Sequence, residues 1–375
     1  MQKLGLLGIL KLGLLLLFQS QLLAKNLNPL LEKAWIFHDF DGNGNSDVGW
    51  QNRESGEYAI WLMNETSLAS LVFFARFSDP DSWFPSAADF NGDGKTDIFW
   101  RNFNTGENIL WIMNGADIVS KTNAQLVPNS WFPYIGDLDG DGKTDIFWRN
   151  FNTSENAIWL MNGTAINNAT SIQAVSTSWI AGVFDFNGDG KVDISWRNRN
   201  TGENAIWLMN GTVINSAASI QTVPYSWFPY IGDFNSDGKT DIFWRNLKTG
   251  ENAIWIMDGT TIKNAAFVQT VPSSWLPYVN DLSGNGKTDI FWRNSNTGEN
   301  AIWIMDGTTI KNTAFVQTVP THWSIGIGNF NGDGKTDIFW RNLKTGENAI
   351  WIMDGTSIQN AAFVQTVPTN WLAWF

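Results

Sequence analysis

Short apolar runs separated by polar turns recur along this chain with a period of about 48 residues. In the third repeat the runs are Trp131–Leu138, Ile146–Arg149, Ala157–Met161 and Ser171–Val175. Each run has the length of a strand and is bounded by turn residues. No segment after residue 30 keeps a 3.6-residue apolar period. The pattern therefore predicts an all-β chain made of four-stranded units.

Two turns in each unit carry specific signals. The turn between the third and fourth runs is Asn-Gly or Asp-Gly in six units, dipeptides that tolerate the positive φ of tight hairpins. The turn between the second and third runs mostly reads R-N-x-x-T-G-E, with a glycine available for a left-handed position. The strands of one unit are therefore expected to be antiparallel.

The strand interiors favour a closed ring over a linear stack. Ile98–Trp100 and Ile254–Met257 are apolar at consecutive positions, so both faces of each small sheet need a cover. A β-propeller supplies it by packing each blade between two neighbours, and the period lies in the propeller range. We predict a seven-bladed propeller over residues 31–375. Trp371–Phe375 repeats the start of a first strand; it either pairs near residues 34–40 to close the ring, the favoured reading, or begins a truncated eighth unit.

Each unit also contributes three tryptophans, such as Trp83, Trp100 and Trp111. Those of the second and third strands are expected to pack between blades, where large apolar side chains contribute most. Exposed platforms for sugar rings are the alternative, and the first-strand tryptophan is left open between the two.

The acidic motif D-x-[D/N/S]-x-[D/N]-G-x-x-D lies between the first two strands of every unit, with Asn329 replacing its first Asp in the seventh. Side chains at positions 1, 3, 5 and 9 and the carbonyl of position 7 offer hard oxygen donors, and Gly at position 6 permits a sharp turn. Such donors, without His or Cys, favour Ca²⁺ over zinc or copper. Mg²⁺ is disfavoured because it keeps several waters in near-octahedral sites. An EF-hand is excluded because position 12 is Trp, not Glu, and strand sequence follows.

The motif predicts up to seven Ca²⁺ sites. Their ligands would be Asp39, Asp41, Asn43, Asn45, Asp47, Asp89, Asn91, Asp93, Lys95, Asp97, Asp137, Asp139, Asp141, Lys143, Asp145, Asp185, Asn187, Asp189, Lys191, Asp193, Asp233, Asn235, Asp237, Lys239, Asp241, Asp281, Ser283, Asn285, Lys287, Asp289, Asn329, Asn331, Asp333, Lys335 and Asp337.

These sites are not expected to be equal. The third loop carries four carboxylates at positions 1, 3, 5 and 9, the sixth and seventh carry two each, and the others carry three. More ligand charge generally means tighter Ca²⁺ binding, so the third loop should bind best and the last two weakest. Solvated polar turns are the alternative reading of any single loop.

Charge and the N-terminus bear on location. The formal net charge of −12 would be largely cancelled by seven Ca²⁺ ions, and no basic cluster suggests nucleic acid. Residues 1–24, with Lys3, Lys11 and an apolar run at Leu12–Phe18, resemble a secretory signal peptide. An uncleaved anchor is the alternative. We expect a protein that is secreted or on the cell surface, has no further membrane insertion, and is a monomer; without cysteine, Ca²⁺ loops would take the stabilising role of disulfides.

The chain resembles the FG-GAP/VCBS repeat family, to which the integrin α-subunit propeller is related. The resemblance rests on Asp89–Ile98 and its six counterparts. It implies a Ca²⁺-stabilised propeller used for adhesion or for binding a ligand.

The function expected is non-catalytic binding of an extracellular protein or glycan. His38 and His322 are the only histidines and lie in different repeats, and no nucleophile–base pair is evident. A multivalent Ca²⁺-dependent lectin is an alternative, using Arg101, Glu107, Trp111 and their equivalents. The competing reading of that set is an Arg–Glu ion pair across the hairpin with Trp in the core. A purely structural matrix role is the third alternative.

Overall fold

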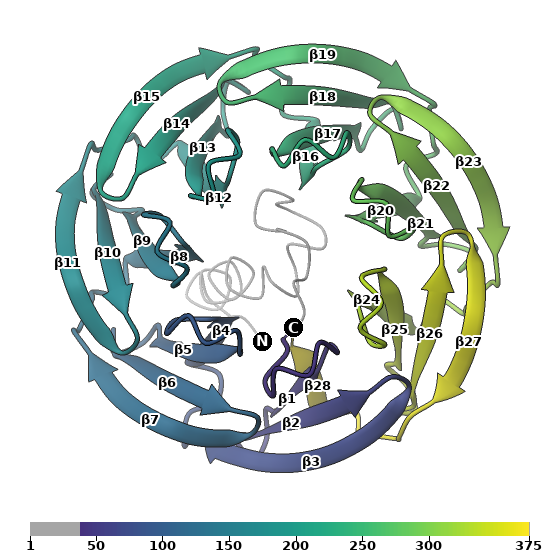
Figure 1. The fold of residues 1–375 in the computed structure, drawn as a ribbon, viewed down its shortest axis with the longest axis horizontal. Coiled ribbons are helices and arrows are strands. Elements are labelled where there is room, and N and C mark those ends of the chain that lie inside the picture. Colours follow the sequence, from purple (N-terminus) through teal and green to yellow (C-terminus); the bar gives the residue numbers. More distant parts are fainter. Residues whose placement is uncertain (1–37, 375) are drawn as a thin grey trace, which may run out of the picture.

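The computed structural model describes residues 38–374, in which every regular element is a β-strand. Seven four-stranded antiparallel sheets stand in a ring around a central axis (Figure 1). The predicted all-β, seven-bladed propeller is therefore confirmed. The described part of the chain holds no helix long and apolar enough to cross a membrane. The proposed signal peptide, residues 1–24, lies outside the described residues.

Each blade is numbered after the repeat that supplies most of it. The strands, from the axis outward, are β28 (Trp371–Trp374), β1 (Val48–Asn52), β2 (Glu57–Asn64) and β3 (Ser67–Arg76) in blade 1; β4 (Trp83–Ala88), β5 (Asp97–Asn102), β6 (Asn108–Asn114) and β7 (Asp117–Ala124) in blade 2; β8 (Trp131–Gly136), β9 (Asp145–Asn150), β10 (Asn156–Asn162) and β11 (Ala165–Ile172) in blade 3; β12 (Trp179–Phe184), β13 (Asp193–Asn198), β14 (Asn204–Asn210) and β15 (Val213–Ile220) in blade 4; β16 (Trp227–Gly232), β17 (Asp241–Asn246), β18 (Asn252–Asp258) and β19 (Thr261–Val268) in blade 5; β20 (Trp275–Asn280), β21 (Asp289–Asn294), β22 (Asn300–Asp306) and β23 (Thr309–Val316) in blade 6; and β24 (Trp323–Gly328), β25 (Asp337–Asn342), β26 (Asn348–Asp354) and β27 (Ser357–Phe363) in blade 7.

The fourth strand of each blade lies earlier than its apolar run suggested. In blade 3, β11 starts at Ala165, which pairs with Asn162 across a two-residue turn, whereas the sequence placed this strand at Ser171–Val175. The expectation was wrong because the fourth strand is the outermost one and faces solvent. Because most of its residues are polar, a prediction based on apolar runs does not locate it.

The C-terminal segment closes the ring. β28 pairs antiparallel with β1, with Trp371 opposite Asn52 and Trp374 opposite Gly49. The C-terminus therefore supplies the first strand of blade 1, and the truncated eighth unit is excluded. Of the predicted partner, residues 34–40, positions 34–37 lie outside the described residues. The Trp374 ring does pack against His38 and Phe40, but the strand pairing is with β1, because a first strand lies beside the second strand of its own blade.

Seven hydrophobic clusters fill the gaps between neighbouring blades. The cluster between blades 5 and 6, for example, combines Phe243 and Ile254 with Trp292. The second- and third-strand tryptophans are buried in every blade, which confirms them as core residues. The strands β5, β9, β13, β17, β21 and β25 are buried along their whole length, as consecutive apolar positions require.

Candidate metal sites in the blade loops

In loops 1 to 6 the backbone coils around the carboxylate at position 1. In loop 2, one carboxylate oxygen of Asp89 accepts a hydrogen bond from the N–H of Gly92 at 2.6 Å, and the other accepts from Gly94 at 2.8 Å. Gly94 has φ 82°, a conformation that a side chain would strain. The glycine of the motif is thus a geometric requirement of the coil, as its sequence position indicated.

The position-9 aspartate ties each loop to its own blade. In loop 2, Asp97 accepts one hydrogen bond from the N–H of Phe90 at position 2 (2.9 Å) and one from Met113 on β6 (2.8 Å). The same two contacts recur in all seven loops. These side chains are buried, and no salt bridge found between residues 38 and 374 involves them.

Burial disfavours the ionised form of the position-9 carboxylates. It raises the pKa of Asp47 to about 8, of Asp145, Asp241 and Asp337 to about 7, and of Asp97, Asp193 and Asp289 to about 6, against the partly compensating backbone N–H donors. A buried carboxylate without a cationic partner is costly, and proteins usually pair such a charge or give it a metal. The donor set therefore fits a divalent cation.

Loops 1 and 3 bring three carboxylates together. Oxygens of Asp39, Asp41 and Asp47, and likewise of Asp137, Asp139 and Asp145, lie within 4.8 Å of one another. These are positions 1, 3 and 9. Loops 2, 4 and 5 have Asn at position 3 and carry their third carboxylate at position 5. There it accepts from the N–H of position 7, as Asp93 does from Lys95 at 2.9 Å.

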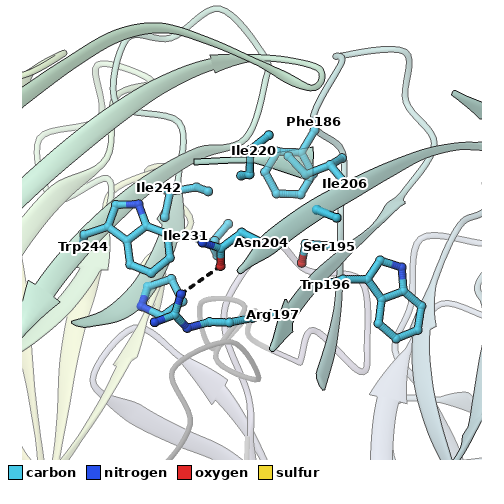
Figure 2. Close-up of a pocket in the computed structure, with 12 residues that line it drawn as sticks. Phe186, Ser195, Trp196, Arg197, Asn204, Ile206, Ile220, Ile231, Ile242 and Trp244 are labelled. Atoms are coloured by element: carbon cyan, nitrogen blue, oxygen red, sulfur yellow. Dashed lines mark hydrogen bonds between the residues drawn. The ribbon is translucent and has the colours of Figure 1, made fainter. Parts of the chain in front are cut away.

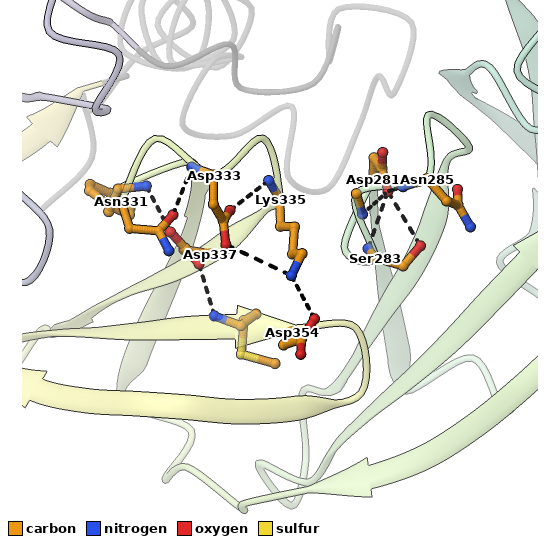
Figure 3. Close-up of polar contacts among 11 residues, drawn as sticks. Asp281, Ser283, Asn285, Asn331, Asp333, Lys335, Asp337 and Asp354 are labelled. Carbon is orange, nitrogen blue, oxygen red and sulfur yellow. Dashed lines mark hydrogen bonds and ion pairs between the residues drawn. The ribbon is translucent and has the colours of Figure 1, made fainter.

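In loop 7 the indication of a cation site is a side-chain oxygen that lacks a hydrogen-bond donor within the described part of the chain. The side-chain oxygen of Asn329, at position 1, is buried and has no hydrogen-bond donor among the residues described. Loops 6 and 7 have the fewest carboxylates. Figure 3 shows the polar side chains of the two loops on the same face of the propeller.

In loops 2, 4, 5, 6 and 7 the lysine side chain at position 7 contacts the outer hairpin of its own blade. In loop 7, Lys335 forms a 2.7 Å ion pair with Asp354 at the hairpin between β26 and β27 (Figure 3). Lys239 and Lys287 pair in the same way with Asp258 and Asp306, each at 2.5 Å. Only the backbone carbonyl of position 7 is then available as a ligand. In loop 3, Lys143 instead pairs with Asp141 at 3.2 Å.

The predicted sugar-binding set is not a site. Arg101 is buried and hydrogen-bonds Asn108 and the carbonyls of Pro128 and Trp131, while its guanidinium lies 5.0 Å from the Trp148 ring of the next blade. Glu107 instead accepts from Thr105 at 2.7 Å. The sugar-binding set and the Arg–Glu ion pair were therefore wrong, because the arginine lies in the blade interface. The core position expected for the tryptophan is confirmed, since Trp111 is buried.

This arginine contact recurs between blades. In Figure 2, Arg197 donates to Asn204 at 2.9 Å, and its guanidinium lies 4.8 Å from Trp244 of blade 5. Burial lowers the pKa of Arg197 to about 10, so it stays charged at neutral pH. Blade 1 has Gln51 in the arginine position, and there Tyr58 packs against Trp100 instead. These residues contribute to the buried contacts that hold the blades together.

A half-open aromatic groove is lined by all four strands of blade 5 and by the linker that follows β15 of blade 4. Its volume is about 250 Å³, and Gln221, Pro224, Trp227, Trp255 and Phe267 are among its lining residues. Trp227 contacts Phe267 edge-on at 6.0 Å, and 75% of Phe267 is exposed. None of the described residues that line the groove is charged.

The same Trp–Phe pair occurs in four adjacent blades. Trp275–Phe315, Trp323–Phe363 and Trp371–Phe73 repeat it in blades 6, 7 and 1. In blades 2, 3 and 4 the phenylalanine position is Asn123, Ser171 and Ser219. The apolar pattern missed this feature because the phenylalanines lie on the outer strands, which it had misplaced.

The FG-GAP-like repeat model matches residues 39–100, 89–148, 137–196, 185–244 and 281–340, which is more than half of the chain. The chain belongs to the FG-GAP-like repeat family. No curated protein matches the chain significantly.

Solved structures resemble the fold of this chain at low sequence identity. A chain of the Photorhabdus luminescens Tc holotoxin pore has a TM-score of 0.50 and 11% identity; the match covers 87% of this chain and 17% of that one. Virginiamycin B lyase from Staphylococcus aureus, in complex with quinupristin, has a TM-score of 0.49 and 11% identity over 83% of this chain and 93% of its own. A putative 6-phosphogluconolactonase from Bacteroides fragilis has a TM-score of 0.46 and 14% identity, with coverages of 89% and 99%. These likenesses concern the fold and carry no activity over to this FG-GAP-like protein, which spans under a fifth of the toxin chain.

Proposed function

We propose that this FG-GAP-like protein is a non-catalytic extracellular binding module whose propeller is stabilised by Ca²⁺ in the blade loops. The observation that carries the metal assignment is the buried position-9 carboxylate, which in all seven loops has no cationic partner among residues 38–374. When bound, Ca²⁺ would supply the positive charge that these carboxylates lack. Positions 1, 3 and 9 would hold it most strongly in loops 1 and 3.

Thermal unfolding in Ca²⁺ and in chelator tests the metal assignment. Each occupied site adds about 2.7 kcal/mol when free Ca²⁺ is 100-fold above its dissociation constant, so the melting temperature should rise clearly with Ca²⁺. Mg²⁺ at the same concentration should give a smaller rise, since it demands octahedral geometry and keeps its waters. Equal melting temperatures in Ca²⁺ and chelator would refute the proposal.

A matched pair of variants makes the test specific to the loops. Asp145→Asn removes the buried carboxylate of loop 3 and should reduce the Ca²⁺-dependent rise. Asp117→Asn makes the same charge change on the exposed outer strand β7 and should leave that rise as in the parent protein.

For the ligand, the groove favours a neutral glycan as the second, more specific candidate. Aromatic rings pack against the apolar faces of sugars, and Gln221 and Thr222 at the groove edge offer hydrogen bonds to hydroxyls. The absence of charged lining residues argues against an anionic ligand. Four such pairs in adjacent blades would make binding multivalent, so weak single sites would add up.

A glycan array with a groove variant tests this candidate. Phe267, Phe315 and Phe363 would be changed together to Ser, the residue that blades 3 and 4 already carry at this position, so folding should persist. Val213→Ser, at another exposed apolar position on β15, is the control. Glycan signals that the groove variant loses and the control keeps support the candidate. Signals unchanged by the groove variant, or none at all, leave a protein ligand as the alternative to pursue.

A further inference from the structure

The seven acidic loops form one closed ring of hydrogen bonds. In each loop the N–H of position 8 donates to the position-1 carbonyl of the preceding loop, at 2.6 to 2.9 Å. Thr96 donates to Asp39 and Val192 to Asp137, for example, and Ser46 of loop 1 donates to Asn329 of loop 7. The seam at which the two ends of the chain meet is therefore linked in the same way as every other interface.

These bonds join two peptide groups that also serve the proposed metal sites. The peptide between positions 7 and 8 presents its N–H to the preceding loop and its C=O, at position 7, to its own site. The peptide between positions 1 and 2 accepts that bond at its C=O, and its N–H donates to the position-9 carboxylate of its own loop. In loop 2 this second bond joins Phe90 to Asp97 at 2.9 Å.

We infer that these paired peptides couple Ca²⁺ binding between neighbouring loops, with positive cooperativity around the ring; this inference rests on the proposed Ca²⁺ function. A Ca²⁺ ion that orders the carbonyl of position 7 in one loop also fixes the N–H of position 8. That N–H holds the peptide that positions the buried carboxylate of the preceding loop. The second ion therefore binds a loop whose backbone is already partly ordered, so its binding costs less conformational entropy.

A second contact supports the same coupling. The glycine N–H of the outer hairpin of each of blades 2 to 7 donates to the position-2 carbonyl of the preceding loop, as Gly115 does to Phe40 at 2.7 Å and Gly211 to Leu138 at 2.8 Å. Successive peptides of each loop are thus held by the next blade. Hydrogen bonds in chains polarise one another, so a cation at one end of the relay also strengthens the bonds along it.

The coupling has a consequence for the poorest sites. Loops 6 and 7 have two carboxylates each, and loop 7 lies between loop 6 and the three-carboxylate cluster of loop 1. Ca²⁺ in loop 1 should therefore assist loop 7 through the bond from Ser46 to Asn329. Ser46 adds a second link there, since its hydroxyl accepts from the N–H of Asn329 at 3.0 Å.

Hydrogen exchange followed by mass spectrometry during a Ca²⁺ titration of the full chain tests the inference loop by loop. Asp139→Ala removes a ligand from loop 3 whose side chain is not part of the peptide relay. We expect the Ca²⁺ midpoints of loops 2 and 4 to rise about 5-fold or more, the lower end of typical allosteric coupling, while loop 6, across the ring, keeps its midpoint. In the parent protein the Ca²⁺ titration curves of the loops should have a Hill coefficient above 1.

Each result has one reading. If only the Ca²⁺ midpoint of loop 3 shifts, the sites are independent and the coupling is overturned. If the midpoint of loop 6 shifts as much as those of loops 2 and 4, the variant destabilises the whole protein, and the coupling is again overturned. Ser46→Ala should raise the midpoint of loop 7 and leave loop 3 unchanged; an unchanged loop 7 counts against the relay at the seam. Asp117→Ala, on the outer strand, should change no midpoint. A parent protein without Ca²⁺-dependent protection in any loop would instead refute the Ca²⁺ proposal itself.

Discussion

At the scale of single residues, the buried arginines show how much one side chain does for blade packing. Arg245 donates to Asn252 and to the carbonyls of Pro272 and Trp275, and its guanidinium lies 4.7 Å from the Trp292 ring. The planar guanidinium can make all of these contacts at once, which a lysine cannot. The buried charge is therefore balanced by backbone dipoles and an aromatic face instead of by an acid.

Arg245→Ala should be strongly destabilising. It leaves the carbonyls at the blade interface without donors and removes the cation–aromatic contact, so the free energy of unfolding should fall by about 3 kcal/mol. Denaturant unfolding at saturating Ca²⁺ measures this. Arg199→Ala is the matched control, since Arg199 is exposed and its guanidinium donates to the carbonyl of Thr177 on the surface. Similar losses in the two variants would contradict the role given to Arg245.

Position 3 of the loop is the second residue-scale determinant. It is Asp in the two loops whose carboxylates cluster and Asn in loop 2. Asn91→Asp should therefore create a cluster of positions 1, 3 and 9 in loop 2 and tighten its Ca²⁺ binding, on the order of tenfold. Calorimetric titration would show this. The converse change, Asp139→Asn, should weaken loop 3 more than Asp141→Asn, because the position-5 carboxylate lies outside the cluster; the reverse order would disprove this geometry.

At the scale of elements, closure of the ring depends on one close contact. β28 lies against β1, and a Cβ atom built on Gly49 would stand 2.3 Å from the Trp374 ring. The glycine thus makes room for the tryptophan that seals blade 1. In the other blades the equivalent position of the second strand is Phe, or Ser195 in blade 4.

Gly49→Ala should consequently loosen the closing strand. We expect a loss of about 1 to 3 kcal/mol in the free energy of unfolding, the usual cost of overpacking. Combined with Trp374→Ala, the added methyl group should cost much less than it does alone, because the ring it strikes is gone. A double-variant cycle measured by denaturant unfolding gives the coupling. Additive losses would show that the two residues do not meet.

At the scale of the whole molecule, the seven buried carboxylates set how stability depends on pH. Their pKa values, raised to between about 6 and 8 in the folded protein, exceed the value near 3.8 of a free side chain. Without metal, the folded state then binds more protons than the unfolded state from about pH 4 upward. Their contribution to stability is present at low pH and is lost as pH rises through the folded pKa values.

Unfolding in chelator should show this sign directly. Between pH 5 and pH 8 the free energy of unfolding should fall, whereas in saturating Ca²⁺ it should rise over the same window, because protons compete with the ion for the carboxylates. Asp47→Asn, which removes the group with the highest pKa, should flatten the fall in chelator near pH 8. A metal-free protein that became more stable with rising pH would contradict the burial of these groups.

Much of the architecture could be read from the chain. The repeat length, the doubly apolar second strands and the turn dipeptides specify a closed ring of four-stranded blades, because local chemistry and burial point the same way in every unit. The acidic loops were located residue by residue for the same reason: their coil depends on neighbours a few positions away, such as Asp89 and Gly94.

Contacts between segments far apart in sequence decided the rest. The partner of Trp371–Trp374, the inward turn of Arg101 and the outer position of Phe267 each depend on what the adjacent blade or strand presents. The sequence by itself determined the blades and the seven loops, since their signals are local and repeated. Only the tertiary structure decided that these loops are bonded head to tail around the ring, because each link joins residues of different blades.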